Sequence, residues 1–143
     1  GIRDYKVTGV QTCALPISID CDVLQGDGGT RTASITGGFV ALALACRKLL
    51  AEGKVERDPI VHQVAAVSAG IVDDVPLLDL PYSEDSRAQV DLNCVMNEKG
   101  ELIEIQGTGE GRSFTLSEQQ ELVRLCAQGI RELMAKQREI LDQ

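Results

Sequence analysis

The chain has 143 residues, 43% of them hydrophobic and 25% charged, which suits one soluble domain with a packed core. Its formal net charge of −8 argues against a broad electrostatic grip on nucleic acid by this chain alone, because such binding needs clustered lysine and arginine. Its five cysteines are widely spaced without a C-x-x-C pair, which excludes a zinc or disulfide framework and favours a reducing compartment.

Residues 1–18 differ in character from the rest of the chain. Residues 7–17 resemble the translation of a common sequencing-library adapter oligonucleotide, and Pro16 would interrupt a central strand. We therefore expect residues 1–18 to be a non-native segment joined to a native domain over residues 19–143. The alternative is a native but irregular N-terminal strand. No signal peptide and no membrane-spanning run is predicted.

Residues 19–50 predict a strand, a glycine-rich turn and a helix. Residues 19–25 have the pattern of a strand, and residues 26–38 combine glycines and hydroxyls with Arg31. Apolar residues then recur every three or four positions across residues 32–50, which predicts one apolar helix face. The members of that face are Ile35, Phe39, Leu42, Cys46 and Leu49.

The glycine-rich turn has the chemistry of an anion site. Glycine lets the backbone approach an anion closely, and the first N–H groups of a helix have no intrahelical partner. Arg31 adds a planar set of charged donors. We therefore predict a phosphate site around Gly28–Thr32; the alternative is an ordinary strand-to-helix turn with Arg31 in solvent. No Lys-Ser/Thr pair follows the last glycine, which excludes a Walker A loop.

Two hairpins are predicted in the middle of the chain. Residues 61–72 are rich in valine, alanine and isoleucine and are expected to form a buried strand, which turns at Asp73-Asp74 and returns from Pro76. A second hairpin is predicted from the strands 92–96 and 101–106, which a four-residue turn separates. The glycine-rich residues that follow, 107–111, are expected to form a flexible loop.

The polar segment between the two hairpins contains Asp85 and Asp91. Paired carboxylates could hold Mg²⁺, which takes one or two carboxylates together with water and substrate phosphate oxygens. A phosphate-binding arginine and such an acid pair are the two halves of a phosphoryl-transfer site. The alternative is that both aspartates are solvated loop residues. His62, the single histidine, has no obvious nucleophile as a partner and is assigned a structural role.

The last element predicted is a long helix. Thr115 and Glu118 fit a capping box at its start, and the apolar stripe that follows predicts core packing as far as about Leu141. The order strand, helix, hairpin, hairpin, helix predicts an α+β fold, with a mostly antiparallel sheet and helices packed on one face.

From Ile19 onward the chain resembles the C-terminal half of the ribonuclease PH family. The runs that carry the resemblance include Asp-Gly-Gly-Thr-Arg-Thr at 27–32, Tyr-Ser-Glu-Asp-Ser at 82–86 and Ile-Glu-Ile-Gln-Gly-Thr at 103–108. The first and last of these runs are highly specific together. The resemblance implies a ribosomal protein S5 domain 2-like α+β fold, of which this chain is one half.

The resemblance also implies a function: a phosphate-dependent 3′-to-5′ exoribonuclease that trims transfer RNA precursors and releases nucleoside diphosphates. It implies that Gly29, Thr30 and Arg31 bind inorganic phosphate. It implies that Asp85 and Asp91 hold Mg²⁺, and that these two aspartates and Arg31 are the catalytic residues. The implied enzyme is cytoplasmic, forms a hexameric ring, binds the 3′ end of tRNA and does not involve a membrane.

The resemblance implies that the N-terminal half of the family fold is missing, together with basic RNA contacts and another phosphate-binding arginine. We therefore expect the 143-residue chain to be inactive, or nearly so, by itself. The alternative from another class is a non-catalytic exosome-like ring subunit with a structural and RNA-binding role. Such subunits tend to lose the arginine or the acids, whereas Arg31, Asp85 and Asp91 are all present here. A kinase on the same superfold would have a serine-rich phosphate loop, which this loop is not.

Overall fold

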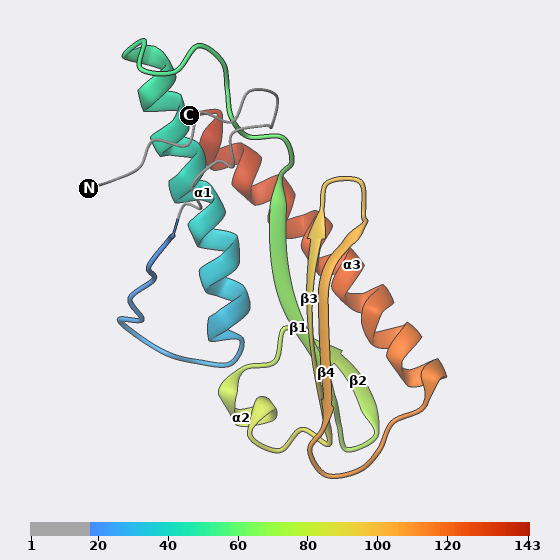
Figure 1. Cartoon of the computed structure of the whole chain (residues 1–143). Coiled ribbons are helices and arrows are strands. Elements are labelled where there is room, and N and C mark those ends of the chain that lie inside the picture. The colour runs from blue at the N-terminus through green and yellow to red at the C-terminus, as the bar shows by residue number, and fades with distance from the viewer. Residues whose placement is uncertain (1–17) are drawn as a thin grey trace, which may run out of the picture.

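The structure is a computed structural model that describes residues 18–143 (Figure 1). The segment expected to be non-native, residues 1–18, lies almost entirely outside the described residues. The elements in chain order are α1 (Thr30–Ala51), β1 (Val64–Val72), β2 (Val75–Leu78), α2 (Tyr82–Asp85), β3 (Val90–Asn97), β4 (Leu102–Gly109) and α3 (Leu116–Leu141).

The four strands form one antiparallel sheet in the order β2-β1-β3-β4. β1 pairs with β3 along almost its whole length, from Val64 to Ile71, but with β2 only from Ala69 to Val72. The turn between β1 and β2 consists of Asp73 and its neighbour Asp74, both of which have positive φ angles, as a tight hairpin turn requires. Both predicted hairpins are therefore confirmed, and so is the α+β class.

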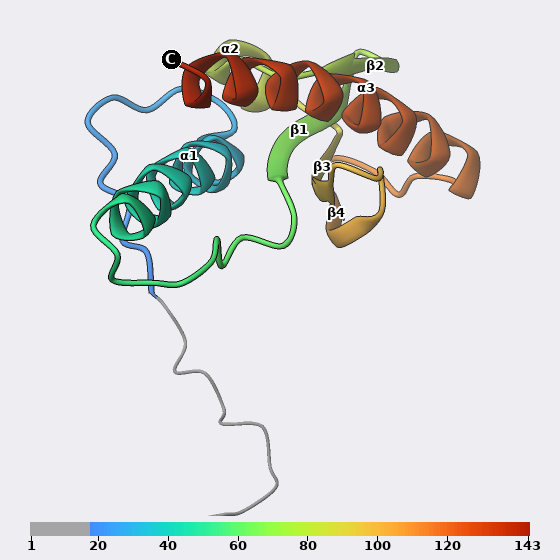
Figure 2. The same ribbon diagram turned by 90° about the horizontal axis from the view of Figure 1, so that it is seen from above.

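Helix α3 covers one face of the sheet and forms the main core with it (Figure 2). Alternate residues of β1 and β3 point toward α3, because successive side chains of a strand lie on opposite faces. The fully buried side chains of this core include Ile71, Val90, Leu92, Cys94, Leu122, Cys126 and Ile130. The predicted apolar stripe of α3 is thus confirmed as core packing.

Helix α1 lies against β1 and also contacts α3 (Figure 2). Because β2 is short, no strand pairs with the first half of β1 along the edge opposite β3. Side chains of α1 and α3 form hydrogen bonds with the backbone of β1 there instead. The Thr36 hydroxyl accepts from Ala66 N and donates to Ala66 O, both at 3.0 Å. The buried Gln137 amide of α3 donates to Val64 O at 3.0 Å and to Thr36 O at 2.9 Å. These contacts fix α1 beside the sheet.

The buried face of α1 agrees with the predicted apolar face only at Cys46. Its buried residues are Thr32, Ala43 and Cys46, whereas Leu49 is 38% exposed. Small side chains face the sheet because α1 approaches the backbone of β1 closely enough for Thr36 to bond with it. The larger apolar residues predicted for that face, Ile35, Phe39 and Leu42, are only half-buried.

By length and composition, α1 is the one described helix that could cross a membrane. The expectation that no run reaches this threshold is wrong by this measure. The observation is weak evidence for a membrane, because a core helix of a soluble protein passes the same test. In this structure α1 packs against β1 and α3 on one side, while most of its residues are exposed or half-buried.

Two further predictions of local structure are wrong. Residues 19–25 do not form a strand, because no other strand in the described part of the chain lies beside them to supply hydrogen bonds. Gly107 and Gly109 are not in a loop but in β4, where they pair with Leu92 and Val90. Crowding favours glycine at position 107, since a Cβ would lie 3.2 Å from the Phe114 ring.

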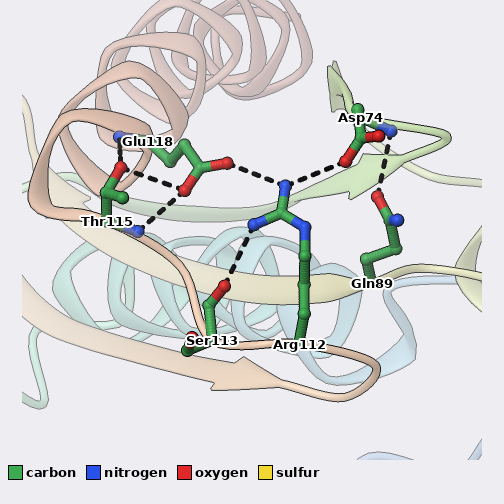
Figure 3. A network of polar contacts seen from close by, with 6 residues as sticks. All are labelled: Asp74, Gln89, Arg112, Ser113, Thr115 and Glu118. Atoms are coloured by element: carbon green, nitrogen blue, oxygen red, sulfur yellow. Dashed lines mark hydrogen bonds and ion pairs between the residues drawn. The ribbon is translucent and has the colours of Figure 1, made fainter.

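Arg112 fixes the connection between β4 and α3 (Figure 3). Its Nη2 group donates to Glu118 of α3 at 2.8 Å and to Asp74 of the β1–β2 turn at 3.2 Å. The predicted capping box is present: Glu118 N donates to the Thr115 hydroxyl, and the Glu118 carboxylate accepts from Thr115 N. Together these bonds lower the pKa of Glu118 to about 2, with Arg112 as the largest cause.

Candidate functional site

The candidate site lies on the face of the sheet that points away from α3. Asp91 and Asn93 alternate along β3 with core residues that face α3, so their side chains lie on the opposite face. The strand registers place Thr108 beside Asp91, and Ser68 and Gln106 on either side of Asn93. This face therefore carries a row of polar groups at the centre of a well-packed sheet.

The structure brings the two predicted acids together. Asp91 is half-buried in β3, and its Oδ2 accepts a hydrogen bond from Asn93 Nδ2 at 3.0 Å. Partial burial raises the pKa of Asp91, and the nearby charge of Asp85 at the end of α2 raises it further. Glu110 raises the pKa of Asp91 as well, although less than Asp85 does. Sequence reasoning did not single out Glu110, and no motif marked it.

The predicted phosphate loop has the backbone geometry of an anion site. Gly29 is the N-cap of α1 in a left-handed conformation, with φ 70° and ψ 25°, and it supplies no side-chain cap. The hydroxyl of Thr30 donates to Asp27 O at 3.0 Å, and that of Thr32 donates to Gly29 O at 2.8 Å. The hydroxyl protons are thus directed at the loop itself, which leaves the backbone N–H groups of the first helical turn as its donors for an anion.

Arg31 does not contact the acid pair. Its Nη2 group binds both carboxylate oxygens of Glu104 in β4, at 2.7 and 2.9 Å. The Arg31 side chain is 51% exposed and that of Glu104 42% exposed. Exposed ion pairs contribute at most about 1 kcal/mol, so the release of Arg31 to an anion would cost little. Glu104 was not predicted as a site residue, although it lies within the Ile-Glu-Ile-Gln-Gly-Thr run.

The loop and the acid-bearing helix lie directly against each other. Asp27 Oδ1 accepts hydrogen bonds from Gly28 N at 2.9 Å and from Tyr82 N at 2.5 Å. Gly28 has no room for a side chain, because a Cβ there would overlap the carbonyl group of Leu80. The segment that would hold phosphate and the segment that carries Asp85 are therefore in contact.

Ser68 lies beneath the loop. Its buried hydroxyl oxygen has no hydrogen-bond partner within residues 18–143, and a Cβ at Gly29 would lie 3.1 Å from it. Two features therefore favour glycine at position 29: its positive φ and its close approach to Ser68.

The acid pair fits a magnesium ion that keeps most of its water ligands. In the described part of the chain, no group of three or more His, Cys, Asp or Glu side chains is placed to hold a metal. Mg²⁺ needs no such cage, since it is commonly bound by one or two carboxylates and by substrate phosphates. Burial first, and then the nearby charge of Asp85, raise the pKa of Asp91. A divalent cation at the pair would offset the repulsion between the two carboxylates.

His62 lies outside this site. Its Nδ1 lies 2.8 Å from Glu98 Oε1; His62 lies just before β1, and Glu98 lies in the turn between β3 and β4. This contact joins two surface segments and agrees with a structural role.

Comparison with known proteins identifies close relatives. Residues 62–129 match the profile described as "3' exoribonuclease family, domain 2". The chain is 57% identical over 126 residues to Ribonuclease PH of Neisseria gonorrhoeae, an alignment that covers 88% of this chain and 52% of that protein. It is 56% identical over 125 residues to Ribonuclease PH of Corynebacterium efficiens, with 87% of this chain and 51% of that protein covered. The chain thus spans about half the length of the curated relatives it matches.

The fold is similar to solved structures as well. Rice Rrp46 superposes with a TM-score of 0.63 at 17% identity, and the match covers 84% of this chain and 51% of that chain. A structure titled "Archaeal exosome core" gives a TM-score of 0.50 at 21% identity, over 56% of this chain and 32% of that one. At such identities the likeness concerns the fold, and it agrees with the predicted α+β class.

Proposed function

We propose that this chain supplies the C-terminal part of a phosphorolytic 3′-to-5′ exoribonuclease of the ribonuclease PH family, to which its sequence is similar. One observation carries the proposal beyond the family: the glycine loop at the start of α1 contacts α2, and Asp85 of α2 lies close enough to Asp91 to raise its pKa. An anion site and an acid pair thus adjoin on one face of the sheet.

In the proposed reaction, the backbone N–H groups that follow Gly29, together with Arg31, hold inorganic phosphate. A phosphate oxygen forms a bond to the phosphorus of the 3′-terminal nucleotide. The bond between that phosphorus and the 3′ oxygen of the preceding nucleotide breaks. A nucleoside diphosphate leaves, and the 3′ oxygen of the shortened RNA takes up a proton. The contribution of the protein is mainly positioning and charge stabilisation.

We assign the magnesium ion of this reaction to Asp85 and Asp91. When bound there, it supplies positive charge that offsets the negative charge on the transferring phosphoryl group. Asn93 holds Asp91 in place through its 3.0 Å hydrogen bond. Half-burial of Asp91 reduces the competition of bulk water for its carboxylate.

The RNA substrate and the assembly are part of the same proposal. We propose that the complete protein trims the 3′ ends of tRNA precursors as a ring of like subunits, hexameric and cytoplasmic as the resemblance implies. With a net charge of −8, this chain provides little of the attraction for RNA. The basic RNA contacts would have to come from the rest of the complete protein and from neighbouring subunits.

The test requires a completed protein, made by joining residues 19–143 to the N-terminal part of Ribonuclease PH from Neisseria gonorrhoeae. We expect this protein to shorten a tRNA 3′ tail only when phosphate is present. Arg31→Ala should reduce phosphorolysis at least about a hundredfold, as the loss of one charge-stabilising donor does in other enzymes. Arg31→Lys is the matched variant that keeps the charge but loses the planar set of donors.

The non-catalytic ring subunit makes the opposite prediction. If the completed protein binds RNA but never releases nucleoside diphosphate, or if Arg31→Ala leaves phosphorolysis undiminished, the enzyme proposal is wrong. Arg31, Asp85 and Asp91 are all retained, which favours the enzyme over the structural subunit.

A further inference from the structure

Asp27 lies between the phosphate loop and the acid-bearing helix and is bonded to both. One carboxylate oxygen, Oδ1, accepts from Gly28 N on the loop side and from Tyr82 N on the helix side. Tyr82 is the first residue of α2, and Asp85 is its last. The carboxylate thus occupies the N-terminal end of α2 and holds the backbone of the loop at the same time.

The backbone of Asp27 is tied into the loop as well. Its carbonyl oxygen accepts from the Thr30 hydroxyl at 3.0 Å. Within residues 18–143, the bond from Tyr82 N to Asp27 is the only hydrogen bond between the loop 26–32 and α2. Gly28 also packs against the Leu80 carbonyl, two residues before α2, so closely that a Cβ at position 28 would overlap it.

We propose that Asp27 is a positioning residue that makes the phosphate loop and the acid pair act as one unit. Through Asp27, an anion that orders the loop also fixes α2, and a cation held by Asp85 and Asp91 also fixes the loop. This inference rests on the proposed function, because it assumes that the loop binds phosphate and that the acids bind Mg²⁺. Neither the family resemblance nor the sequence pattern assigns such a role to this residue.

The charge of Asp27 suits the role. Its hydrogen bonds from Tyr82 N and Gly28 N lower the pKa of its carboxyl group, so the group stays ionised near neutral pH. An ionised acceptor forms stronger hydrogen bonds to N–H groups than a neutral one. Asparagine at this position would keep an oxygen acceptor for both bonds, whereas alanine would remove them.

The consequence is positive coupling between two ligands. If the loop and α2 move together, phosphate that orders the loop also orders α2, and Mg²⁺ that orders α2 also orders the loop. Each ligand therefore raises the affinity of the chain for the other. Without Asp27, the loop and α2 order separately, and only the direct attraction between the cation and the anion still couples the two ligands.

The experiment is a nuclear magnetic resonance titration of the 143-residue chain with inorganic phosphate, with and without Mg²⁺. In the unmodified chain, we expect Mg²⁺ to tighten phosphate binding about fivefold, the low end of the range for coupled sites. Phosphate should shift the amide signals of the loop and also those of α2. In Asp27→Ala, the ratio of the phosphate affinities with and without Mg²⁺ should fall toward one, because only the direct attraction between the two ions remains, and the α2 shifts should disappear. Asp27→Asn should keep most of the coupling.

Asp22→Ala is the control, since Asp22 is exposed and forms no side-chain hydrogen bond within the described residues. It should behave like the unmodified chain. The proposal is overturned if Asp27→Ala keeps the magnesium effect, or if the unmodified chain shows no effect of Mg²⁺ on phosphate binding. Phosphorolysis by the completed protein tests the proposed function separately, so each can fail without the other.

Discussion

Gly28 shows how a single residue sets the geometry of the site. A Cβ at this position would overlap the Leu80 carbonyl, so any other residue must push the loop away from α2. Gly29 has a second constraint, because its φ of 70° lies in the region that side chains disfavour. The contact between loop and acids therefore depends on the absence of two side chains.

Replacing glycine by alanine at two positions tests whether crowding requires glycine at position 28. Gly28→Ala should destabilise the fold by about 1–3 kcal/mol and weaken phosphate binding, because the loop must shift. Gly37→Ala is the control: it lies inside α1 with nothing within 4 Å of the added Cβ, so it should stabilise the fold by about 0.5–1 kcal/mol. Urea unfolding measures both changes. Equal effects of the two substitutions would contradict the crowding argument.

At the scale of elements, the Thr36 side chain holds α1 to the sheet. Its hydroxyl forms the hydrogen bonds to Ala66 that a neighbouring strand would otherwise form. Thr36→Val keeps the shape of the side chain but removes both hydrogen bonds to Ala66. The unsatisfied backbone groups should cost about 1–3 kcal/mol of unfolding free energy, measured by urea denaturation. Thr36→Ser keeps the hydroxyl and should lose much less. If the valine variant is as stable as the serine variant, the hydrogen bonds of the Thr36 hydroxyl to Ala66 do not stabilise the fold, and the prediction is wrong.

The start of α3 predicts a pH dependence of stability. The pKa of Glu118 is lowered in the folded state from its ordinary 4.5 to about 2, chiefly by Arg112 (Figure 3). A lowered folded-state pKa means that the contribution of Glu118 to stability is complete above about pH 4.5 and is lost as the pH falls toward 2. Glu118→Gln should therefore be less stable than the unmodified chain near pH 6, and the difference should shrink between pH 4.5 and 2. A difference that stays constant with pH would contradict this assignment.

At the scale of the whole molecule, we propose that the chain carries one side of the site. The acid pair and the glycine loop are in place, but Arg31 is bound to Glu104, and the chain spans about half the length of its curated relatives. We expect the 143-residue chain to show no phosphorolysis of a tRNA 3′ tail, whereas the completed protein should. Measurable release of nucleoside diphosphates by the chain alone would show that it needs no further part.

The sequence by itself determined most of the local structure. The two hairpins, the capping box at Thr115, the apolar stripe of α3 and the α+β class follow from period, turn residues and capping chemistry, which act over a few positions. The candidate site residues Gly29, Arg31, Asp85 and Asp91 came from the chemistry of their types and from the family resemblance. Their roles as ligands of phosphate and Mg²⁺ stay predictions.

Only the tertiary structure decided which segments meet. Residues 19–25 have a strand pattern but no neighbouring strand, and Gly107 and Gly109 have a loop pattern but lie in β4, because pairing partners decide strand formation. α1 turns small residues toward β1, because the contact of Thr36 with Ala66 requires a close approach. The pairing of Arg31 with Glu104 and the link through Asp27 join positions 73 and 55 residues apart in the chain. A local sequence pattern cannot predict contacts between residues so far apart in the chain, since these contacts depend on how the whole chain packs.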